Sequence, residues 1–419
     1  MENYQYVIIG GGLAGGKAIE GIRERDGKGR IALVTAEPHR PYERPPLSKK
    51  YLRGEQDQEK VYVAEAGYYD DPSITLLTAT EVTEIDPEAH TLVLEGAQLD
   101  SDNREMTYDK LLLATGGRPR RLPIPGNELE NVFTLRTIED SANIRAAAGP
   151  GKTSLILGGS FIGSEVAASL SMIGTDVTMI FPEGRLFERV MPPEMSEWLH
   201  MIYASRNIRI HPQVTAERFF GNAAVERATL SNGAMPTIDL VVMGVGIELN
   251  TQLAEQAELE VRDDDKAVLV NRQLQTSHPD IYAAGDIAAW PDETFGKRLR
   301  VEHWDVARNQ GMLAGRNMAG AGEPYTTLPY FFSDLFDLSF DVWGDLSSWD
   351  ETVRRGELET RNFAFYYFAD GKLAGVLAMG RPDEESKPMQ KLVRARPSYE
   401  DVAKPLSDES VNLSDLLGS

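Results

Sequence analysis

The sequence contains no cysteine among its 419 residues. Disulfide exchange and sulfenic acid chemistry both require a cysteine sulfur atom. Disulfide reductase and thiol peroxidase activities are therefore excluded. If the chain binds a redox cofactor, the electrons that reach this cofactor must leave it directly.

Positive charge is also scarce, and long apolar runs are missing. The chain has 43 Lys and Arg against 65 Asp and Glu, a net charge of −22. This balance argues against nucleic acid or anionic lipid as the main partner, although the charge has the simpler interpretation that it aids solubility. No apolar run approaches the length of a membrane span, and the first expected strand starts too close to Met1 for a signal peptide. We expect a cytoplasmic protein without membrane insertion.

The stretch 6–25, YVIIGGGLAGGKAIEGIRER, has the pattern of a strand, a tight turn and a helix. Its glycines have G-x-G-x-x-G spacing: Gly10 permits the turn, Gly12 lets a pyrophosphate approach the backbone, and Gly15 lets helix and strand pack closely. The N–H groups at the helix start can hold phosphate charge. After a second strand-like run, the carboxylate of Glu37 can bind a ribose. Taken alone, the pattern is also compatible with an ordinary glycine-rich turn.

This pattern occurs a second time along the chain. In 154–170, SLILGGSFIGSEVAASL, an apolar strand runs into Gly158, Ser160 and Gly163, and Glu183 follows the next strand. Two such units imply two dinucleotides. Ser160 stands at the close-approach position, so we expect the second pyrophosphate slightly farther from the backbone.

A chain of this length should form several domains. A proline- and arginine-rich loop, 39–55, carries Arg44 and Lys49, and Val82 lies in a predicted hairpin strand. An exposed surface position is the alternative interpretation of Lys49. Residues 118–150 form a connector, helical at its end, and the second unit then repeats the order of the first.

The region after the second unit returns to the first type of fold. We expect a helix over 248–261 and then an apolar strand that ends at Gly285 and Asp286. Ligands bind at the carboxyl ends of parallel strands, which favours a binding role for Asp286; a helix N-cap is the alternative. The next helix should begin near His303 or Trp304.

The last part of the chain, from about residue 324, is rich in aromatic residues. Segment 362–380, NFAFYYFADGKLAGVLAMG, predicts two strands joined around Asp370 and Gly371. Most of the aromatic side chains should form a core. We expect a small domain with a mixed sheet, followed from residue 400 by a polar tail that is partly ordered.

Seven stretches between residues 7 and 334 are informative together: VIIGGGLAGG, RPPLSKKYL, LLLATGGRPR, LGGSFIGSEVAASL, YAAGDIA, VEHWDVARNQG and YFFSD. They resemble the FAD-dependent, NAD(P)H-dependent reductases of the ferredoxin and rubredoxin type, the putidaredoxin reductase-like family. Apoptosis-inducing factor and monodehydroascorbate reductase share these motifs, and FPE at 181–183 with VEH is most similar to apoptosis-inducing factor and its bacterial relatives. The resemblance implies an α/β fold with two Rossmann-like dinucleotide-binding domains, as in glutathione reductase, and a small C-terminal α+β domain.

The resemblance also implies the domain limits and the reaction. FAD would bind to residues 1–117 and 248–324, NADH to 118–247, and 325–419 would form the C-terminal domain. Hydride would pass from NADH to flavin N5, and electrons would then leave one at a time to a ferredoxin or rubredoxin. No metal site is predicted.

The cofactor-binding set implied by the resemblance is spread over the first 332 residues. Gly12, Ala14 and Glu37 would hold the FAD pyrophosphate and adenosine ribose, and Arg44 and Lys49 would reach the cofactor. The full set is Gly10, Gly12, Leu13, Ala14, Gly15, Glu37, Arg44, Lys49, Val82, Thr115, Gly116, Arg118, Gly158, Ser160, Phe161, Ile162, Gly163, Glu165, Glu183, Gly246, Gly285, Asp286, Glu302, His303, Trp304 and Phe332.

Other members of this set have individual roles in the resemblance. Val82 would meet the adenine and Asp286 the ribitol. His303 and Trp304 would lie along the isoalloxazine edge. Phe332 stands where some relatives carry tryptophan, which puts a tryptophan-mediated electron exit in doubt.

On the nicotinamide side, Phe161 would cover the flavin and move aside when NADH arrives. Glu165 would pair with Lys49 beside flavin N5, and these two are the predicted catalytic residues; a solvated helix carboxylate is the alternative for Glu165. Glu183 favours NADH because a carboxylate would repel the 2′-phosphate of NADPH. Arg185 nearby weakens this preference.

The predicted electron acceptor, a small iron–sulfur protein of the ferredoxin or rubredoxin type, rests on the resemblance. An acidic ferredoxin would be repelled unless arginines form a basic patch; the candidates are Arg298, Arg300, Arg308, Arg316, Arg394 and Arg396. Two alternatives stay open: an NADH-sensing flavoprotein with slow turnover, like apoptosis-inducing factor, and an NADH oxidase or quinone reductase. The sequence also leaves open whether the protein forms a homodimer.

Overall fold

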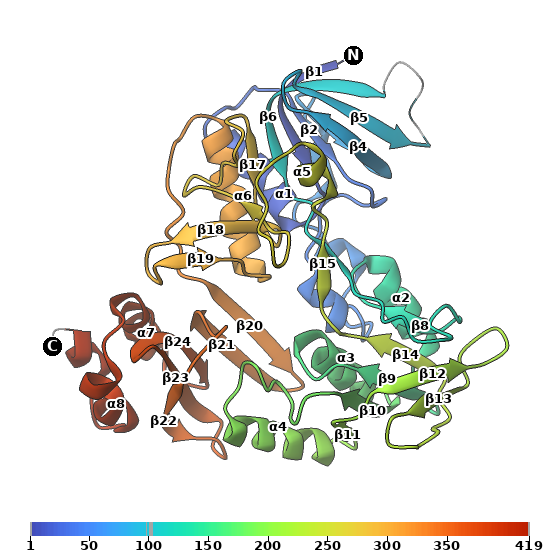
Figure 1. Ribbon diagram of the computed structural model, residues 1–419, viewed down its shortest axis with the longest axis vertical. Helices are drawn as coiled ribbons and strands as arrows, with labels where there is room; N and C mark the ends of the chain where they lie inside the picture. Colours follow the sequence, from blue (N-terminus) through green and yellow to red (C-terminus); the bar gives the residue numbers. More distant parts are fainter. Residues whose placement is uncertain (1, 98, 100–103, 418–419) are drawn as a thin grey trace. The chain divides into compact units, whose positions relative to one another are not determined.

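The structure is a computed structural model that describes residues 2–97, 99 and 104–417. The chain forms two compact units, each assembled from three separate segments (Figure 1). Unit 1 consists of Met1–Arg44, Gln58–Arg118 and Glu248–Pro329, and unit 2 of Pro45–Asp57, Pro119–Ile247 and Tyr330–Ser419.

Unit 1 is built on a sheet with strand order β3-β2-β1-β6-β5-β4, in which β17 also pairs with β6. Strands β1, β2, β3, β6 and β17 run parallel, whereas β4 and β5 form an antiparallel hairpin beside β6. These elements are β1 (Glu2–Ile9), α1 (Leu13–Arg23), β2 (Ile31–Val34), η2 (Gln58–Val61), η3 (Ala66–Asp70), β3 (Ile74–Leu77), β4 (Thr80–Asp86), β5 (Thr91–Gly96), β6 (Glu105–Leu113) and β17 (Ile281–Ala283).

The remaining elements of unit 1 include a second, three-stranded sheet of order β16-β18-β19. They are α5 (Gln252–Gln256), β16 (Val268–Leu269), β18 (Ala288–Asp292), β19 (Lys297–Leu299) and α6 (Trp304–Met318). At the boundary of the units, β7 (Gly117–Pro119) pairs with β15 (Ile247–Leu249).

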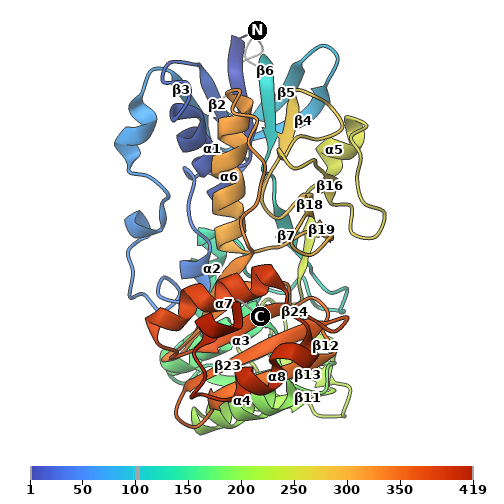
Figure 2. The same cartoon turned by 90° about the vertical axis from the view of Figure 1, so that its left-hand side faces the viewer.

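Helices α1 and α6 lie side by side (Figure 2). Their contact is made by backbone, because glycines stand where the two helices meet. A Cβ atom on Gly311 would lie 2.3 Å from the carbonyl oxygen of Ala14, and one on Gly315 would lie 2.1 Å from that of Ala18. Both distances are far below van der Waals contact, so glycine is required at these positions.

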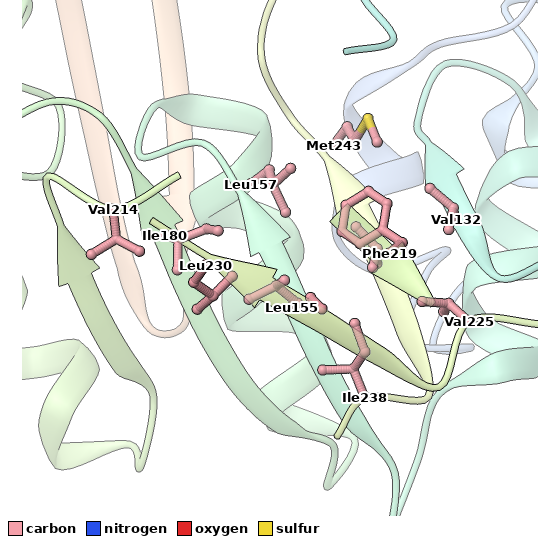
Figure 3. Close-up of a cluster of buried hydrophobic side chains, with 12 residues drawn as sticks. Val132, Leu155, Leu157, Ile180, Val214, Phe219, Val225, Leu230, Ile238 and Met243 are labelled. Carbon is pink, nitrogen blue, oxygen red and sulfur yellow. The ribbon is translucent and has the colours of Figure 1, made fainter. Parts of the chain in front are cut away.

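Unit 2 contains a second parallel sheet, with strand order β11-β10-β9-β14-β8. A hairpin of β12 and β13 packs on it through the apolar cluster drawn in Figure 3, where the Phe219 ring lies among Val132, Val225 and Met243. The elements are η1 (Pro45–Ser48), β8 (Val132–Thr134), α2 (Ile138–Ala147), β9 (Thr153–Leu157), α3 (Phe161–Met172), β10 (Asp176–Phe181), α4 (Pro193–Ser205), β11 (Arg209–Pro212), β12 (Ala216–Phe220), β13 (Arg227–Leu230) and β14 (Leu240–Met243).

The C-terminal part of unit 2 is an antiparallel sheet with strand order β20-β21-β24-β23-β22. Helices α7 and α8 follow it in the chain. The elements are β20 (Tyr330–Leu335), β21 (Leu338–Gly344), β22 (Glu351–Glu357), β23 (Asn362–Ala369), β24 (Lys372–Met379), α7 (Asp383–Ala395), α8 (Tyr399–Ser407) and η4 (Leu413–Leu417).

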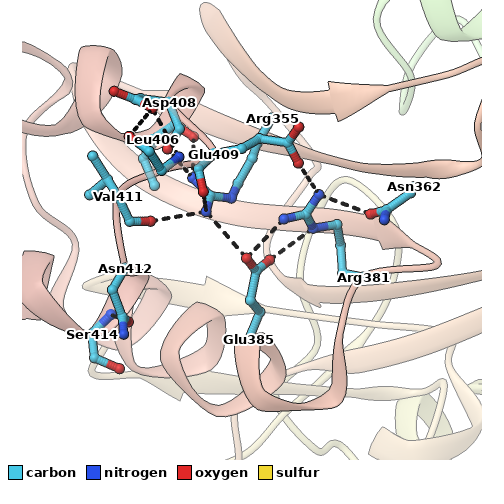
Figure 4. Close-up of polar contacts among 11 residues, drawn as sticks. Arg355, Asn362, Arg381, Glu385, Leu406, Asp408, Glu409, Val411, Asn412 and Ser414 are labelled. Carbon is cyan, nitrogen blue, oxygen red and sulfur yellow. Dashed lines mark hydrogen bonds and ion pairs between the residues drawn. The ribbon is translucent and has the colours of Figure 1, made fainter.

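A buried arginine on strand β22 binds the segment that follows helix α8 (Figure 4). Arg355, which is 2% exposed, donates hydrogen bonds to the carbonyl oxygens of Asp408 and Val411 at 2.6 and 3.0 Å. It also pairs with Glu385, which Arg381 binds from the other side. The tail is thus held by donors that water cannot easily replace.

Most predicted elements are present, including the strand pairs, the helix that starts at Trp304 and an α2 helix begun by a Thr137 capping box. Four expectations were wrong in part. Residues 248–261 form only the short helix α5, the connector contributes strand β8, the C-terminal sheet is antiparallel and not mixed, and the expected tail continues as helices α8 and η4. The helix N-cap alternative for Asp286 is also excluded, because strand β18 follows it.

Candidate functional site

The first glycine turn, between β1 and α1 in unit 1, has the geometry of a phosphate site. Gly10 has φ +122°, and a Cβ atom there would lie 2.2 Å from the carbonyl oxygen of Ala114. A Cβ atom on Gly15 would lie 2.0 Å from the carbonyl oxygen of Gly10, whereas one on Gly12 would have no neighbour within 4 Å among the described residues. Gly12 is the N-cap residue of α1, and as a glycine it has no side chain to bind the first N–H groups of the helix. Free space and helix N–H donors therefore fit a diphosphate at this turn.

Glu37, after β2, is already engaged by two side chains. Arg44 Nη2 lies 2.7 Å from Glu37 Oε1, and the Tyr42 hydroxyl donates to Glu37 Oε2. The structure therefore brings the predicted residues Glu37 and Arg44 together. A ribose that binds Glu37 has to share the carboxylate with these partners.

The region around Asp286 joins three predicted residues of unit 1. The charge of Asp286 acts on both Arg44 and His303. Burial lowers the pKa of His303 to about 4, against an opposing effect of Asp286, so the imidazole is neutral at pH 7. His303 is the N-cap of α6.

A buried glutamine supports the turn that carries Asp286. Gln310 Oε1 accepts a hydrogen bond from the backbone N–H of Gly285 at 2.9 Å. Its Nε2 is buried and has no hydrogen-bond partner among the described residues. A buried donor of this kind is compatible with a polar ligand group beside the turn. The sequence analysis identified neither Gln310 nor Tyr42 as a site residue. For Gln310, a polar residue at a core position of helix α6 could have indicated a role in the site.

The second glycine turn, between β9 and α3 in unit 2, repeats the first. Gly158 has φ +118°, and a Cβ atom on Gly163 would lie 2.3 Å from the Gly158 carbonyl oxygen. Ser160 caps α3 without a side-chain hydrogen bond, and its side chain is exposed. Phe161 packs edge-on against Phe187.

Glu165, on α3, forms the ion pair with Lys49 that was predicted. Lys49 Nζ lies 2.8 Å from Glu165 Oε1, and both residues are buried. The solvated alternatives for these two residues are thereby excluded. Lys49 Nζ also lies 5.9 Å from the centroid of the Phe332 ring. The catalytic role of this pair stays a prediction.

Glu183 follows β10, the position expected for the acid of the second unit. Its partner is Arg189 at 3.7 Å, and this arginine is highly exposed. Arg185, which weakened the predicted preference for NADH, pairs instead with Glu188 at 3.0 Å. Glu183 is therefore held more loosely than Glu37.

The other predicted residues are divided between the two units. Thr115 donates to the Asn250 carbonyl oxygen, Trp304 hydrogen-bonds to Glu43, and Gly116 and Gly246 have positive φ. The members in unit 1 are Gly10, Gly12, Leu13, Ala14, Gly15, Glu37, Arg44, Val82, Thr115, Gly116, Arg118, Gly285, Asp286, Glu302, His303 and Trp304; those in unit 2 are Lys49, Gly158, Ser160, Phe161, Ile162, Gly163, Glu165, Glu183, Gly246 and Phe332.

Several arginines proposed for a basic patch already have partners. Arg300 binds Asp265 and Glu302, and Arg316 binds Glu24 and Glu323. A patch built on these arginines carries less free positive charge than their number suggests. No helix among the described residues is long and apolar enough to span a bilayer.

Residues 4–311 match the family described as pyridine nucleotide-disulphide oxidoreductase. The chain belongs to this family. Residues 330–417 match a second family, described as the reductase C-terminal domain. The predicted fold class of two Rossmann-like domains and a small C-terminal domain is thereby confirmed, as is the predicted oxidoreductase class. A pyridine nucleotide-disulphide oxidoreductase without cysteine has no disulfide to reduce within its own chain.

Three known proteins illustrate the similarity. The anthranilate 1,2-dioxygenase system ferredoxin–NAD(+) reductase component of Burkholderia cepacia is 32% identical over 90% of this chain and 91% of its own. Monodehydroascorbate reductase 3 of Arabidopsis thaliana is 32% identical over 99% of this chain and 97% of its own. The reductase in the crystal structure of a covalent putidaredoxin reductase–putidaredoxin complex has a TM-score of 0.90 and 30% identity over 99% of this chain and 98% of its own. The ferredoxin reductase resemblance is thus confirmed, whereas closeness to apoptosis-inducing factor stays a prediction.

Proposed function

We propose that this protein is an FAD-dependent reductase that oxidises NADH and passes electrons one at a time to a small iron–sulfur protein of the ferredoxin or rubredoxin type. The observation that carries the proposal is the presence of two dinucleotide turns in a chain without cysteine. The similarity to a ferredoxin–NAD(+) reductase component over nine tenths of the chain supports it.

FAD, when bound, supplies the chemistry that converts a two-electron hydride donor into a source of single electrons. The residues of unit 1 fit this group. The N-terminus of α1, with free space at Gly12, would hold the diphosphate, and Glu37 would bind the adenosine ribose. The start of α6, capped by neutral His303, would offer partial positive charge to the negative charge of the reduced flavin.

The residues of unit 2 bind and orient NADH. The N–H groups at the start of α3 would hold its diphosphate, and Phe161 would occupy the nicotinamide position in the absence of NADH. The ammonium of Lys49, held by Glu165, would supply a fixed positive charge for the hydride transfer. Catalysis rests on alignment of the two rings, since a hydride carries both electrons and needs no general base.

Glu183 selects NADH over NADPH in this proposal. The weak contact with Arg189 leaves its carboxylate available for the ribose hydroxyls. The ratio of kcat/KM for NADH and NADPH measures this preference. A wild-type preference for NADPH would mean that Glu183 is misassigned.

We propose domain limits according to the nucleotide that each part of the chain binds. Residues 1–117 and 248–324 bind FAD, 118–247 bind NADH, and 325–419 form the C-terminal domain. We further propose that the protein acts in the cytoplasm, where NADH is produced and iron–sulfur carriers are reduced. Cell fractionation with an antibody to the chain tests this location.

The decisive experiment is anaerobic. Purified holoprotein is mixed with NADH, the flavin spectrum is recorded, and a ferredoxin coupled to cytochrome c is then added. Rapid flavin reduction followed by ferredoxin-dependent cytochrome c reduction supports the proposal. Protein that stays colourless after incubation with FAD contradicts it.

The same experiment separates the alternatives. A long-lived charge-transfer band that survives the admission of air indicates an NADH sensor. Fast reoxidation by air alone indicates an oxidase, and a quinone or monodehydroascorbate that outperforms ferredoxin indicates a reductase of small molecules. Loss of coupled cytochrome c reduction on addition of salt would support a basic docking patch, and salt-independent turnover would count against it.

A further inference from the structure

The carboxylate of Glu165 is held by three side chains of unit 2 and not by Lys49 alone. Ser333 Oγ donates to Glu165 Oε1 at 2.8 Å, the oxygen that also binds Lys49 Nζ, and Ser48 Oγ donates to Oε2 at 2.5 Å. Ser333 and Ser48 are 1% and 2% exposed. Both oxygens of a buried carboxylate are therefore satisfied by fixed donors.

Ser48 belongs to the same short segment as Lys49, and that segment is fastened to its surroundings. The carbonyl oxygen of Ser48 accepts a hydrogen bond from Ser169 Oγ at 2.6 Å, and that of Leu47 accepts one from Ser141 Oγ at 2.7 Å. Ser48 thus reaches Glu165 from the side of the lysine. Ser333 reaches it from strand β20 of the C-terminal sheet.

Strand β20 matches helix α3 in spacing. Phe331 packs edge-on against Phe161 at 5.2 Å between ring centroids, and Ser333 binds Glu165. Residues two apart on a strand lie on one face about 6.7 Å apart, and residues four apart on a helix lie on one face about 6.0 Å apart. The two pairs of contacts therefore fit one straight strand against one helix face.

We propose that Ser333 is a positioning residue, through which the C-terminal sheet fixes Glu165 and thereby the Lys49 ammonium for hydride transfer. This inference rests on the proposed function. Without the Ser333 hydroxyl, Glu165 keeps Lys49 on Oε1 and Ser48 on Oε2, both from the segment of the lysine, and loses the donor that fixes Oε1 from the C-terminal sheet. The ammonium then loses its fixed partner geometry while the fold stays intact.

The test compares Ser333→Ala with Ser164→Ala in the FAD-loaded full-length protein. Ser164 is a matched control, because it is buried on α3 next to Glu165 and its hydroxyl has no hydrogen-bond partner among the described residues. In stopped-flow reduction by NADH, Ser333→Ala should lower the limiting rate about tenfold, the effect of losing one hydrogen bond to a charged group. The NADH concentration at half-maximal rate and the FAD content should stay within about twofold. Ser164→Ala should behave as the wild type.

A double-mutant cycle shows whether Ser333 acts through Glu165. In a Glu165→Gln background, Ser333→Ala should change the limiting rate less than threefold, although it changes the wild-type rate about tenfold. An equal effect in both backgrounds would overturn the inference. Should Ser333→Ala lose FAD or melt early, Ser48→Ala is measured in the same cycle.

A crystal structure of FAD-loaded Ser333→Ala gives a readout that does not depend on activity. The inference expects a rotated Glu165 carboxylate or a Lys49–Glu165 distance beyond 4 Å. An unchanged pair together with a wild-type reduction rate would overturn it. If NADH fails to reduce even the wild type, the proposed function has failed, and this result is distinct from a variant that equals an active wild type.

Discussion

The two glycine turns of the molecule have nearly the same backbone and differ at the close-approach position, where the first has Gly12 and the second Ser160. Gly10 and Gly158 have φ +122° and +118°, and Gly12 and Ser160 share an extended conformation, with φ −84° and −109°. Close carbonyl neighbours require the outer glycines, whereas the middle position has space for a side chain. The fold therefore tolerates Ser160, and a glycine at the middle position serves the ligand and not the chain.

The turns also differ in what packs behind them. Helix α1 meets α6 through glycines, with backbone against backbone, whereas α3 meets β20 through Phe161 and Glu165. A backbone contact cannot adapt to an added atom, but a side-chain contact can weaken by degrees. Substitutions behind the first turn should therefore destabilise unit 1, and those behind the second should change rates.

Gly315→Ala should have the largest effect. Its new Cβ atom would lie 2.1 Å from the carbonyl oxygen of Ala18, so the helices have to separate. We expect unit 1 to lose about 3 kcal/mol or more of its free energy of unfolding, and FAD to be lost with it. Chemical denaturation followed by flavin fluorescence measures both effects. A variant that keeps FAD and wild-type stability would show that this contact is adaptable.

Glu165→Ala should have the next largest effect, on rate and not on cofactor content. Removal of the carboxylate leaves Lys49 buried without its ion-pair partner. We expect flavin reduction by NADH to slow about 100-fold, the scale for loss of one preorganised polar partner, with much less change in FAD retention. Unchanged stopped-flow reduction would remove this pair from the mechanism, and Glu165→Gln controls for the volume of the side chain.

How much of this site the sequence could predict depends on whether local pattern or distant contact defines each residue. Glycine spacing is local, so both turns and their helices were predictable. The Lys49–Glu165 pair joins segments 116 residues apart, and only the resemblance indicated it.

Ser48 and Ser333 show what the sequence could not provide. A serine carries no sign of whether its hydroxyl faces solvent or a carboxylate, and Ser333 reaches Glu165 across 168 positions of the chain. The expected helix over 248–261 failed for a related reason. Its alanine, leucine and glutamate content favours helix, but strand β15 occupies its start, and the backbone takes a positive φ at Glu258, directly after the C-cap of α5. Val261 then pairs with Val268 in an isolated bridge.

Gly12→Ala, at the middle position of the first turn, should weaken FAD binding and leave the stability of the chain nearly unchanged. Its Cβ atom meets no described neighbour within 4 Å, so the free energy of unfolding without cofactor should change by less than about 1 kcal/mol. The methyl group occupies the approach of the pyrophosphate, so we expect FAD affinity to fall about tenfold. Fluorescence titration of the apoprotein with FAD measures this change.

Ser160→Gly should alter NADH affinity less than threefold. A larger gain in affinity would mean that the Ser160 side chain crowds the second diphosphate.

The smallest expected effect is on the pH dependence of Tm, and it compares the N-cap residues of helices α6 and α3. His303 caps α6, whereas the non-titrating Ser160 caps α3. Because burial lowers the His303 pKa from 6.5 to about 4, the unfolded chain takes up a proton there before the folded protein does. Stability from this residue is complete above pH 6.5, falls as pH drops toward 4, and changes no further below that. His303→Gln should therefore reduce the loss of Tm between pH 6.5 and 4, while Ser160→Gly should leave the Tm–pH profile parallel to that of the wild type. Parallel profiles for wild type and His303→Gln would show that the imidazole is protonated without cost, and that the two helix starts do not differ in this respect.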